Sequence, residues 1–410
     1  MHILFLTQIL PYPPDSGPKV KTWHVLKYLS QAGYKITLVS FIRPEEVPYV
    51  DILRQICFQV HTVPIKRSRA ADLGYLLRSQ LSGRPFLIER DDIPAMRSLV
   101  KRIVETESVD VINADQLTMT QFALSFAHRL NGKPALVFDA HNAVWTIVKR
   151  MNETLPFYFK VPLFFEAKRV KAYEANIVAD FDGTLAVAET DRASLINAVQ
   201  EFYPGKAVEK LPITVIPIAV DTQKIRPVDR PENSLNILTM GTLYYPPNAD
   251  GIRWFMQEVF PLVQRVLPAA RLTVVGKNPP SDFLRLAQES QGSIAMTGYV
   301  PELDPYFAEA SIMVIPVRAG GGMRVRILEA FARAMPVVTT TVGLEGIDAQ
   351  PGKDVLVADE PKDFANSVIR LLNDASLQNQ LSMNGRHLVM AKYDWQVTLK
   401  TLETVYQKFG

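Results

Sequence analysis

The strongest constraint on the fold is a pattern that occurs at the start of each half of the chain. An apolar run is followed by a loop rich in proline or glycine, then by a helical stretch and a second apolar run. The paired runs are His2–Thr7 with Lys35–Phe41, and Leu235–Met240 with Arg271–Val275. Short, continuous apolar runs are typical of strands buried on both faces of a parallel sheet. A strand, a crossover helix and a parallel strand form a right-handed βαβ unit, so we predict two doubly wound, Rossmann-like α/β domains.

Further runs predict the other strands and helices. Additional strands are expected in the first half at Asp110–Asn113, Ala135–Asp139 and Thr184–Val187. In the second half they are expected at Ile294–Thr297, Ile312–Val317, Val337–Thr340 and Val355–Val357. The expected helices are Val20–Gln31, Lys168–Asn176, Ala249–Leu267, Val325–Ala334 and Trp395–Lys408.

The length of 410 residues fits two domains of ordinary size. We predict a first domain over residues 1–216, a polar linker with several prolines over 217–233 and a second domain over 234–390. A C-terminal helix within 391–410 is expected to cross back toward the first domain. Ligands of open α/β sheets bind beyond the carboxyl ends of the strands, where the strand order reverses. We therefore expect the two domains to face each other across a cleft.

The composition narrows the class of protein. A hydrophobic content of 48% and a charged content of 21% are globular values. A net charge of +3 is too small to favour nucleic acid, and the single cysteine, Cys57, cannot form an internal disulfide. We find no secretory leader and no run near the roughly 18 apolar residues that span a bilayer, so we expect a cytoplasmic protein.

The segment Leu155–Lys171 is rich in aromatic and basic residues and poor in acids. Such a segment suits the inner face of an anionic membrane or a lipid-linked acceptor. Aromatic stripes also occur in ordinary cores, and Pro156 and Pro162 are expected to break any long amphipathic helix here. A peripheral membrane contact and a core position both stay open.

A glycine turn joins the expected strand Ile312–Val317 to the next helix and consists of Gly320, Gly321 and Gly322. Such a turn exposes backbone N–H groups at the positive end of a helix dipole, where anions bind.

Two arginines and one acid accompany this turn. Arg324 and Arg326 add charge-assisted contacts that suit phosphate oxygens. Glu329 cannot hold phosphate, but its carboxylate can accept hydrogen bonds from ribose hydroxyls. The segment predicts a nucleoside diphosphate site, and an ordinary strand–turn–helix connection with an exposed glutamate is the alternative.

The segment Ile315–Gly346 contains the pattern P-x-R-x-G-G-G-x-R-x-x-I-L-E-A. With this pattern the chain resembles the retaining GT-B glycosyltransferases, a family that includes sucrose synthases and bacterial phosphatidylinositol mannosyltransferases. Val215–Asp221, Val274–Gly276 and Asp180–Arg192 also resemble segments of this family. The resemblance implies two Rossmann-like domains, with the nucleotide sugar held mainly by the C-terminal domain and the acceptor by the N-terminal one.

The resemblance also implies site residues. His141 follows the expected strand Ala135–Asp139 and is expected to act in catalysis with Arg324 and Arg326, by contacting the donor sugar or the charge that develops on the diphosphate. A histidine held in its loop for structural reasons is the alternative. The donor site is expected to contain Gly276, Lys277, Tyr299, Gly320, Gly321, Gly322, Met323, Leu328 and Glu329.

A loop after the first strand contains Asp15, Gly17 and Lys19 and is expected near the acceptor and the donor phosphates, with Lys19 or Lys21 in place of the family's usual arginine. A solvated loop is the alternative. The chain also departs from the family in two places. Gly321 stands where the family has the first acid of a pair, and the loop Gly241–Pro246 lacks the family's arginine and lysine. We expect Arg324 and Arg326 to replace those two cations.

The segment Asp180–Leu185 resembles the first motif of haloacid-dehalogenase-type phosphatases, in which a strand precedes the leading aspartate. Here a helix is expected before Asp180 and the better strand, Thr184–Val187, comes after it. We interpret the match as a chance occurrence.

The sequence therefore predicts a glycosyltransferase that moves a sugar from a nucleoside-diphosphate sugar to an acceptor hydroxyl with retention. We expect a saccharide or lipid-linked acceptor in polysaccharide, glycolipid or glycoconjugate biosynthesis, and no metal or other cofactor, because arginines can neutralise the diphosphate. Two alternatives stay open: a non-catalytic nucleotide-sugar-binding protein, and a nucleotide-sugar epimerase or hydrolase of the same fold. The sugar, the base and the oligomeric state are left undetermined.

Overall fold

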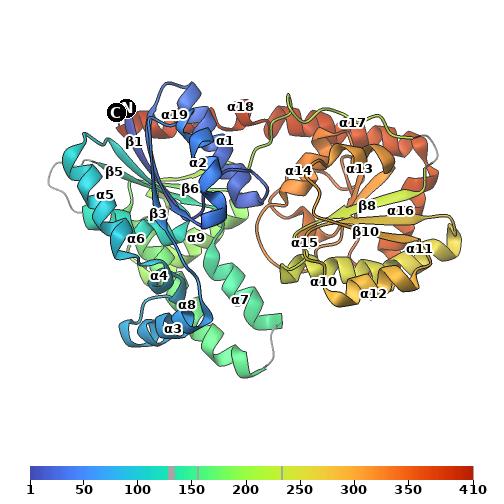
Figure 1. The fold of residues 1–410 in the computed structure, drawn as a ribbon, viewed down its shortest axis with the longest axis horizontal. Helices are drawn as coiled ribbons and strands as arrows, with labels where there is room; N and C mark the ends of the chain where they lie inside the picture. The colour runs from blue at the N-terminus through green and yellow to red at the C-terminus, as the bar shows by residue number, and fades with distance from the viewer. Residues whose placement is uncertain (128–133, 155–156, 232–233, 410) are drawn as a thin grey trace. The chain divides into compact units, whose positions relative to one another are not determined.

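The computed structural model describes residues 1–127, 134–154, 157–231 and 234–409. It confirms an α/β fold with two parallel sheets, each flanked by helices (Figure 1). The chain divides into a first unit, Met1–Ile218 with Thr398–Gly410, and a second unit, Ala219–Val397. Residues 155–156 of the aromatic segment, 232–233 of the expected linker and 410 of the C-terminal segment lie outside the described residues.

The first unit contains a seven-stranded sheet in the order β3-β2-β1-β4-β5-β6-β7. Its strands are β1 (His2–Thr7), β2 (Lys35–Ile42), β3 (Gln59–Pro64), β4 (Val111–Asp115), β5 (Ala135–Ala140), β6 (Gly183–Ala186) and β7 (Ile213–Val215). All neighbouring strands are parallel, and Thr7 at the end of β1 pairs with Asp115 at the end of β4. The strand order reverses between β1 and β4, so the carboxyl ends of these two strands mark the expected ligand edge.

The helices of the first unit pack around a core that includes β1, where Ile3–Leu6 are fully buried. They are α1 (Gly17–Gln31), η1 (Pro44–Tyr49), α2 (Val50–Arg54), α3 (Arg69–Ser82), α4 (Phe86–Asp91), α5 (Pro94–Thr106), η2 (Leu117–Met119), α6 (Thr120–Ala123), η3 (Leu124–Phe126), α7 (Val144–Thr154), α8 (Phe157–Asp180), α9 (Glu189–Phe202), η4 (Val208–Lys210), α19 (Thr401–Tyr406) and η6 (Gln407–Phe409). The Tyr406 hydroxyl of α19 donates to Asn113 Oδ1 of β4 at 2.7 Å. The end of the chain therefore packs against the sheet that begins it.

The second unit contains a six-stranded parallel sheet in the order β10-β9-β8-β11-β12-β13. Its strands are β8 (Asn236–Met240), β9 (Arg271–Val275), β10 (Ile294–Gly298), β11 (Ile312–Ile315), β12 (Val337–Thr339) and β13 (Leu356–Val357). The strand order reverses between β8 and β11, where Ile237 pairs with Ile312. This second reversal lies beside the glycine turn that follows β11.

The helices of the second unit surround this sheet. They are α10 (Pro246–Trp254), the π-helix η5 (Phe255–Val259), α11 (Phe260–Val266), α12 (Ser281–Glu289), α13 (Asp304–Glu309), α14 (Val325–Ala332), α15 (Thr341–Leu344), α16 (Pro361–Asn373) and α17 (Ala375–Lys392). The short helix α18 (Trp395–Thr398) carries the chain from the second unit to the first. Among the described residues, no helix combines the length and the hydropathy that crossing a bilayer requires.

Every predicted strand overlaps an observed one, whereas β3 and β7 were not predicted. Both lie at the edges of the first sheet, and most of their side chains are only partly buried. An edge strand has one neighbour, so it does not need a continuous apolar run. The predicted helix Ala249–Leu267 is divided by η5, because Pro261 lacks the N–H group that a regular helix would use there.

The expectation that Pro162 breaks a long helix is wrong, because α8 continues through this proline to Asp180. Pro162 lies close to the start of the helix, where fewer turns depend on the missing N–H group.

A glycine in α10 sets how closely this helix approaches the strand β11. A Cβ atom on Gly251 would overlap the backbone oxygen of Pro316, directly after β11. We predict that Gly251→Ala lowers the free energy of unfolding by about 1–3 kcal/mol, because backbone atoms must move apart. Urea unfolding measures this loss. Gly205→Ala is the control, since no atom lies within 4 Å of its Cβ position, and equal losses in both variants would contradict the close approach.

Candidate functional site

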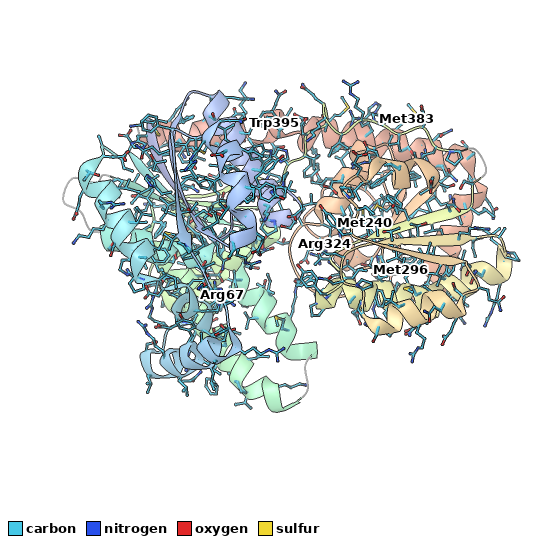
Figure 2. All side chains as sticks on the ribbon, viewed as in Figure 1. Arg67, Met240, Met296, Arg324, Met383 and Trp395 are labelled. Atoms are coloured by element: carbon cyan, nitrogen blue, oxygen red, sulfur yellow. The ribbon has the colours of Figure 1, made fainter. Side chains whose placement is uncertain are left out.

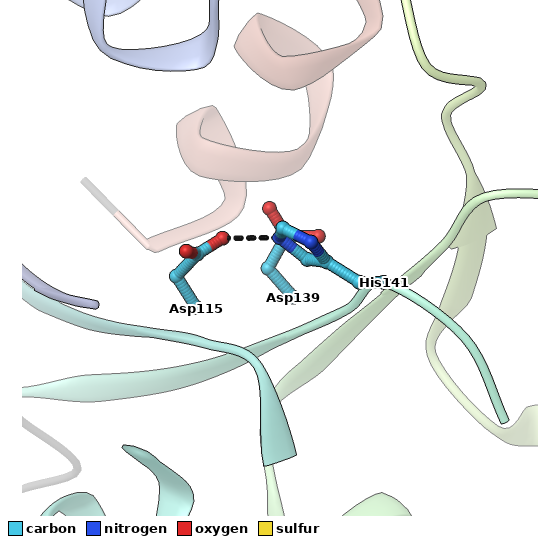
Figure 3. Close-up of side chains that lie close together, drawn as sticks. All are labelled: Asp115, Asp139 and His141. Carbon is cyan, nitrogen blue, oxygen red and sulfur yellow. Dashed lines mark hydrogen bonds and ion pairs between the residues drawn. The ribbon is translucent and has the colours of Figure 1, made fainter. Parts of the chain in front are cut away.

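Four buried polar side chains meet at the carboxyl edge of the first sheet: Lys21, Asp115, Asp139 and His141. Asp115 ends β4, Asp139 lies near the end of β5, and His141 follows β5 directly. Figure 3 shows the two carboxylates and the imidazole side by side. Lys21 comes from α1, the helix that follows β1. The four residues therefore come from the ends of β4 and β5 and from the segments that follow β1 and β5. We call these four residues the first-unit cluster.

The first-unit cluster is held by direct hydrogen bonds. His141 Nε2 lies 2.6 Å from Asp115 Oδ1, and Lys21 Nζ donates to Asp139 Oδ1. Asp115 Oδ2 accepts from the Thr7 and Thr22 hydroxyls, each at 2.9 Å. Burial alone raises the pKa of Asp115, but His141, Lys21 and Thr7 outweigh burial and hold this pKa below its usual value. Asp115 is therefore a carboxylate that fixes the orientation of the His141 ring.

The charges of the cluster are almost balanced. Two carboxylates and one ammonium leave one negative charge beside the His141 ring. His141 Nδ1 and Asp139 Oδ2 are buried, and neither makes a hydrogen bond to a described residue. Buried polar atoms are almost always satisfied. These two atoms are therefore the ones left to form hydrogen bonds with a ligand hydroxyl or oxyanion.

Two further carboxylates hold the loop that carries His141. Glu174 of α8 accepts from the N–H groups of Val144 and Trp145 at 2.8 and 2.9 Å, at the start of α7. Asp191 Oδ1 accepts from the N–H group of Ala143 at 2.9 Å. Burial raises the pKa of Glu174 to about 8, against the effect of the two N–H donors. The position of His141 therefore depends on acidic side chains from two helices outside the sheet, Glu174 of α8 and Asp191 of α9.

The loop before α1 differs from the first-unit cluster. Lys19 Nζ pairs with Glu46 at 3.2 Å and lies 3.9 Å from Asp15, whereas Gly17 begins α1. Lys21, two residues further along α1, is the lysine that reaches the cluster. Asp15, Gly17, Lys19 and His141 were predicted from the sequence as site residues, whereas Asp115 and Glu174 were not. Asp115 follows the expected strand Asp110–Asn113, so its position at a carboxyl end could have indicated it.

In the second unit, Arg326 connects α14 to the end of β8 across the strand reversal. Arg326 Nη1 donates to the carbonyl oxygen of Met240, and Nη2 donates to Asn248 Oδ1 at 2.6 Å. Gly241 leaves the necessary space, since a Cβ atom there would overlap the guanidinium. Burial, with a smaller effect of Arg324, lowers the pKa of Arg326 to about 10, so the side chain stays charged at neutral pH.

Arg324 folds over the glycine turn at the start of α14, and Figure 2 marks it together with Met240. Arg324 Nη1 donates to the carbonyl oxygens of Gly321 and Gly322, each at 2.6 Å. Gly320 and Gly322 have φ angles of 96° and 84°, a left-handed conformation that favours glycine. The turn is therefore closed by its own arginine, and both arginines stand at one end of α14.

Glu329 lies one turn after Arg326 and has a different environment. Burial raises its pKa, while Arg333 and Arg326 act in the opposite direction. Within the described ranges its carboxylate makes no hydrogen bond. The side chains of Met323 and Leu328 are buried, and Leu328 is fully enclosed. Glu329 is thus the acceptor that α14 leaves available beside the two arginines.

The ends of β8, β9 and β10 are joined by backbone hydrogen bonds. The Gly241 N–H group donates to Val275, and the Gly276 N–H group donates to Gly298 at 3.0 Å. A Cβ atom on Gly276 would overlap the Gly241 oxygen, so this approach requires glycine. Lys277 Nζ lies 6.0 Å from the ring centre of Tyr299, whose side chain is largely exposed. Gly276, Lys277 and Tyr299 of the expected donor site therefore lie at the same carboxyl edge as the glycine turn.

The aspartates of the phosphatase-like segment have structural surroundings. The helix α8 runs directly into Asp180, and Asp182 Oδ2 accepts from the Leu136 N–H group at 2.8 Å. Both aspartates precede β6, so they lie at the amino end of the strand. No strand leads into Asp180 as the phosphatase motif requires.

Comparisons with known proteins agree with this geometry. Residues 234–374 match the family described as glycosyl transferases group 1. The chain is 22% identical, over 96% of both chains, to the "Uncharacterized 44.6 kDa protein in cps region" of Klebsiella pneumoniae. It is 30% identical to the "Capsular polysaccharide biosynthesis glycosyltransferase CapM" of Staphylococcus aureus, over 32% of this chain and 34% of that protein.

Two solved structures show the same fold. Sucrose-phosphate synthase from Thermosynechococcus elongatus superposes with a TM-score of 0.71 at 16% identity, over 100% of this chain and 98% of that one. HepE from Anabaena, solved in complex with UDP and glucose, superposes with a TM-score of 0.67 at 14% identity, over 100% of both chains.

The buried Glu174 predicts a pH dependence of stability. Its pKa is about 8 in the folded chain and has its ordinary value of 4.5 when exposed, so the folded state binds more protons between these values. Its contribution to stability is therefore greatest at acid pH and is lost as the pH rises through 8. We expect Glu174→Gln to reduce the loss of unfolding free energy between about pH 6 and pH 9 by on the order of 2 kcal/mol.

Urea unfolding at the two pH values measures this difference. Glu258→Gln, on the exposed side of η5, is the matched control and should lose as much as the original chain. An identical pH dependence in Glu174→Gln and the original chain would contradict the raised pKa.

Proposed function

We propose that this chain, a glycosyltransferase with the GT-B fold, moves a sugar from a nucleoside-diphosphate sugar to the hydroxyl group of a saccharide acceptor. One observation carries the proposal. Arg326 reaches from α14 to the end of β8, so that a half-buried guanidinium, the glycine turn and the Glu329 carboxylate lie together at a strand reversal. The complex of HepE with UDP and glucose supports a donor of this class.

Each part of the nucleotide would have a chemically matched partner. Arg324 and Arg326, with the N–H groups of Gly320–Gly322, would bind the diphosphate, because guanidinium and N–H donors suit phosphate oxygens. The Glu329 carboxylate would accept hydrogen bonds from the ribose hydroxyls. The backbone around Gly276 and the ring of Tyr299 would contact the base.

The difficult step is departure of the diphosphate from the sugar. Donors that are already oriented toward the developing charge stabilise it, and loss of one such donor typically costs about 3 kcal/mol. Hydrogen bonds to Met240 and Asn248 hold Arg326 in place before a ligand arrives. We infer that transfer proceeds with retention, since the glycine turn resembles that of retaining enzymes.

The first unit is proposed to bind the acceptor and to supply His141. Asp115 orients the imidazole, and the buried Nδ1 atom stays available for a hydroxyl or phosphate oxygen. The Klebsiella relative from a cps region and the capsular relative CapM support a role in polysaccharide biosynthesis.

We also propose that the reaction needs no metal. Asp115, Asp139 and His141 could offer ligand atoms within 4.8 Å of one another, but Lys21 already places an ammonium on Asp139. In the second unit the arginines take the place of a divalent cation at the diphosphate.

Gly321 favours a second candidate, a non-catalytic nucleotide-sugar-binding protein, because the family has an acid at this position. A panel of nucleotide sugars assayed for binding and turnover separates the candidates. Turnover that requires an acceptor supports transfer, turnover without one supports an epimerase or hydrolase, and binding without turnover supports the second candidate.

The role of Arg326 can be tested by comparing two ligands that differ only in phosphate. We expect Arg326→Ala to weaken binding of a nucleoside diphosphate by about 10–100-fold and to leave binding of the nucleoside little changed, because a charge-assisted contact is lost. Isothermal titration with UDP and uridine measures both constants. Arg265→Ala on the exposed end of α11 is the control, and equal losses for both ligands would remove Arg326 from the phosphate site.

Chelation tests the proposed independence from metal. Transferase activity measured after dialysis against excess EDTA should equal the untreated activity. A loss of activity that magnesium or manganese restores would show that Asp115, Asp139 and His141, or the diphosphate itself, require a divalent cation.

A further inference from the structure

A cavity of about 580 Å³ lies at the amino end of the first sheet, the edge at which Figure 1 marks the N-terminus. We call it the amino-edge cavity. At about 3.3 Å per residue, β1 separates this edge from the first-unit cluster by about 17 Å. The cavity is therefore distinct from the site at the carboxyl edge. Its lining includes His2 of β1, Lys35 of β2, Phe58 and Gln59 at the start of β3, and Glu107 and Asp110 between α5 and β4.

His2 forms a fixed, polar wall of the amino-edge cavity. Its Nδ1 atom lies 3.0 Å from the carbonyl oxygen of Ser108, which can only accept, so Nδ1 carries a proton. Its Nε2 atom lies 2.9 Å from Thr37 Oγ1 and accepts from this hydroxyl when the ring is neutral. Burial lowers the pKa of His2, in agreement with a neutral ring. Both ring nitrogens are therefore occupied, and neither is left to donate to a third group.

Glu107 lacks a donor because of this arrangement. Its Oε2 atom lies 3.6 Å from His2 Nε2, whose lone pair already accepts the Thr37 hydroxyl. Glu107 Oε2 is buried and makes no hydrogen bond to a described residue. Buried polar atoms are almost always satisfied. A hydroxyl group of a ligand in the cavity is the kind of donor that this carboxylate lacks.

An aromatic ring stands exposed at the same cavity. Phe58 is 59% exposed, although phenylalanine is usually buried. The ring meets His2 edge to face, with the ring centres 6.5 Å apart, and Lys35 Nζ lies 4.0 Å from the Phe58 ring centre. The face of an aromatic ring carries partial negative charge and attracts groups with partial positive charge, among them the C–H groups of a sugar ring. The cavity thus combines a stacking surface with a carboxylate that needs a donor.

The charges at the cavity favour a neutral ligand. Glu107 and Asp110 repel a phosphate or a carboxylate, and the Lys35 ammonium repels a cation. Carboxylates accept hydrogen bonds and an ammonium group donates them, so both suit a ligand with several hydroxyl groups. We propose that the amino-edge cavity binds a neutral saccharide, with a C–H face of the sugar on Phe58 and a hydroxyl group on Glu107.

A saccharide site at the amino edge goes beyond the proposed transfer reaction and does not depend on it. If both hold, one glycan long enough to reach both edges of the first unit is held at two points, and only this consequence rests on the proposed function. Binding of a sugar measured without a nucleotide tests the cavity separately from catalysis.

The test is binding of neutral methyl glycosides to the full chain, titrated by saturation-transfer NMR. We expect at least one of the methyl glycosides of glucose, galactose, mannose and N-acetylglucosamine to bind, with a Kd on the order of 1–10 mM for a single sugar ring. Phe58→Ala should weaken this binding by at least about tenfold, because the stacking surface is lost. Glu107→Gln should weaken it by about 3–10-fold, because a charged acceptor becomes a neutral one.

The matched control is Phe165→Ala, which removes a ring of α8 that is 55% exposed and should bind sugar like the original chain. Thermal unfolding checks that each variant is folded. Absence of binding for all four glycosides, or equal binding by folded Phe58→Ala, would overturn the proposal. Binding that is lost in His141→Ala but kept in Phe58→Ala would place the sugar at the carboxyl edge and would also overturn it.

Discussion

The hydrogen bonds from Arg326 to the end of β8 are the interaction on which the second-unit site depends. They bring a half-buried cation from one side of the strand reversal to the other, and they require the missing side chain of Gly241. The loop Gly241–Pro246 after β8 contains neither arginine nor lysine. Arg326 is therefore the side chain that brings a positive charge to the end of β8. The low pKa of a guanidinium in this place, about 10, reflects burial and still leaves it charged. A cation that is desolvated and fixed in advance interacts more strongly with an arriving diphosphate than one in solvent.

In the first-unit cluster, each buried charge is stabilised by a neighbouring group of the opposite charge or by a hydrogen-bond partner. Asp115 and Asp139 are fully enclosed, and each carboxylate has a nitrogen partner, the His141 ring and the Lys21 ammonium. Removal of one partner would leave a buried charge, which proteins tolerate poorly. The helix α19 belongs to this arrangement, because Tyr406 bonds Asn113 and because burial, Asp139 and Asp115 raise its pKa. The end of the chain thus helps to exclude solvent from residues contributed by the first 141 positions.

Strands and helices could be predicted where the residues of the element itself determine its structure. Central strands such as β1 and β8 read as continuous apolar runs because both of their faces are buried, whereas the edge strands β3 and β7 do not. The glycine turn and its two arginines were found for the same reason, since they are adjacent in the sequence. Asp115 was not identified, because its role arises from a contact across 26 positions, to His141. The part played by Glu174 depends on how α8 crosses the start of α7, which no local pattern expresses.

The helix α3 shows why periodicity alone does not reveal function. Its leucines recur at spacings that are typical of an amphipathic helix, and such a pattern says that one side is apolar but not whether that side faces the core. In the structure, Asp72, Tyr75 and Ser79 take the inner side, so the apolar side is left to solvent.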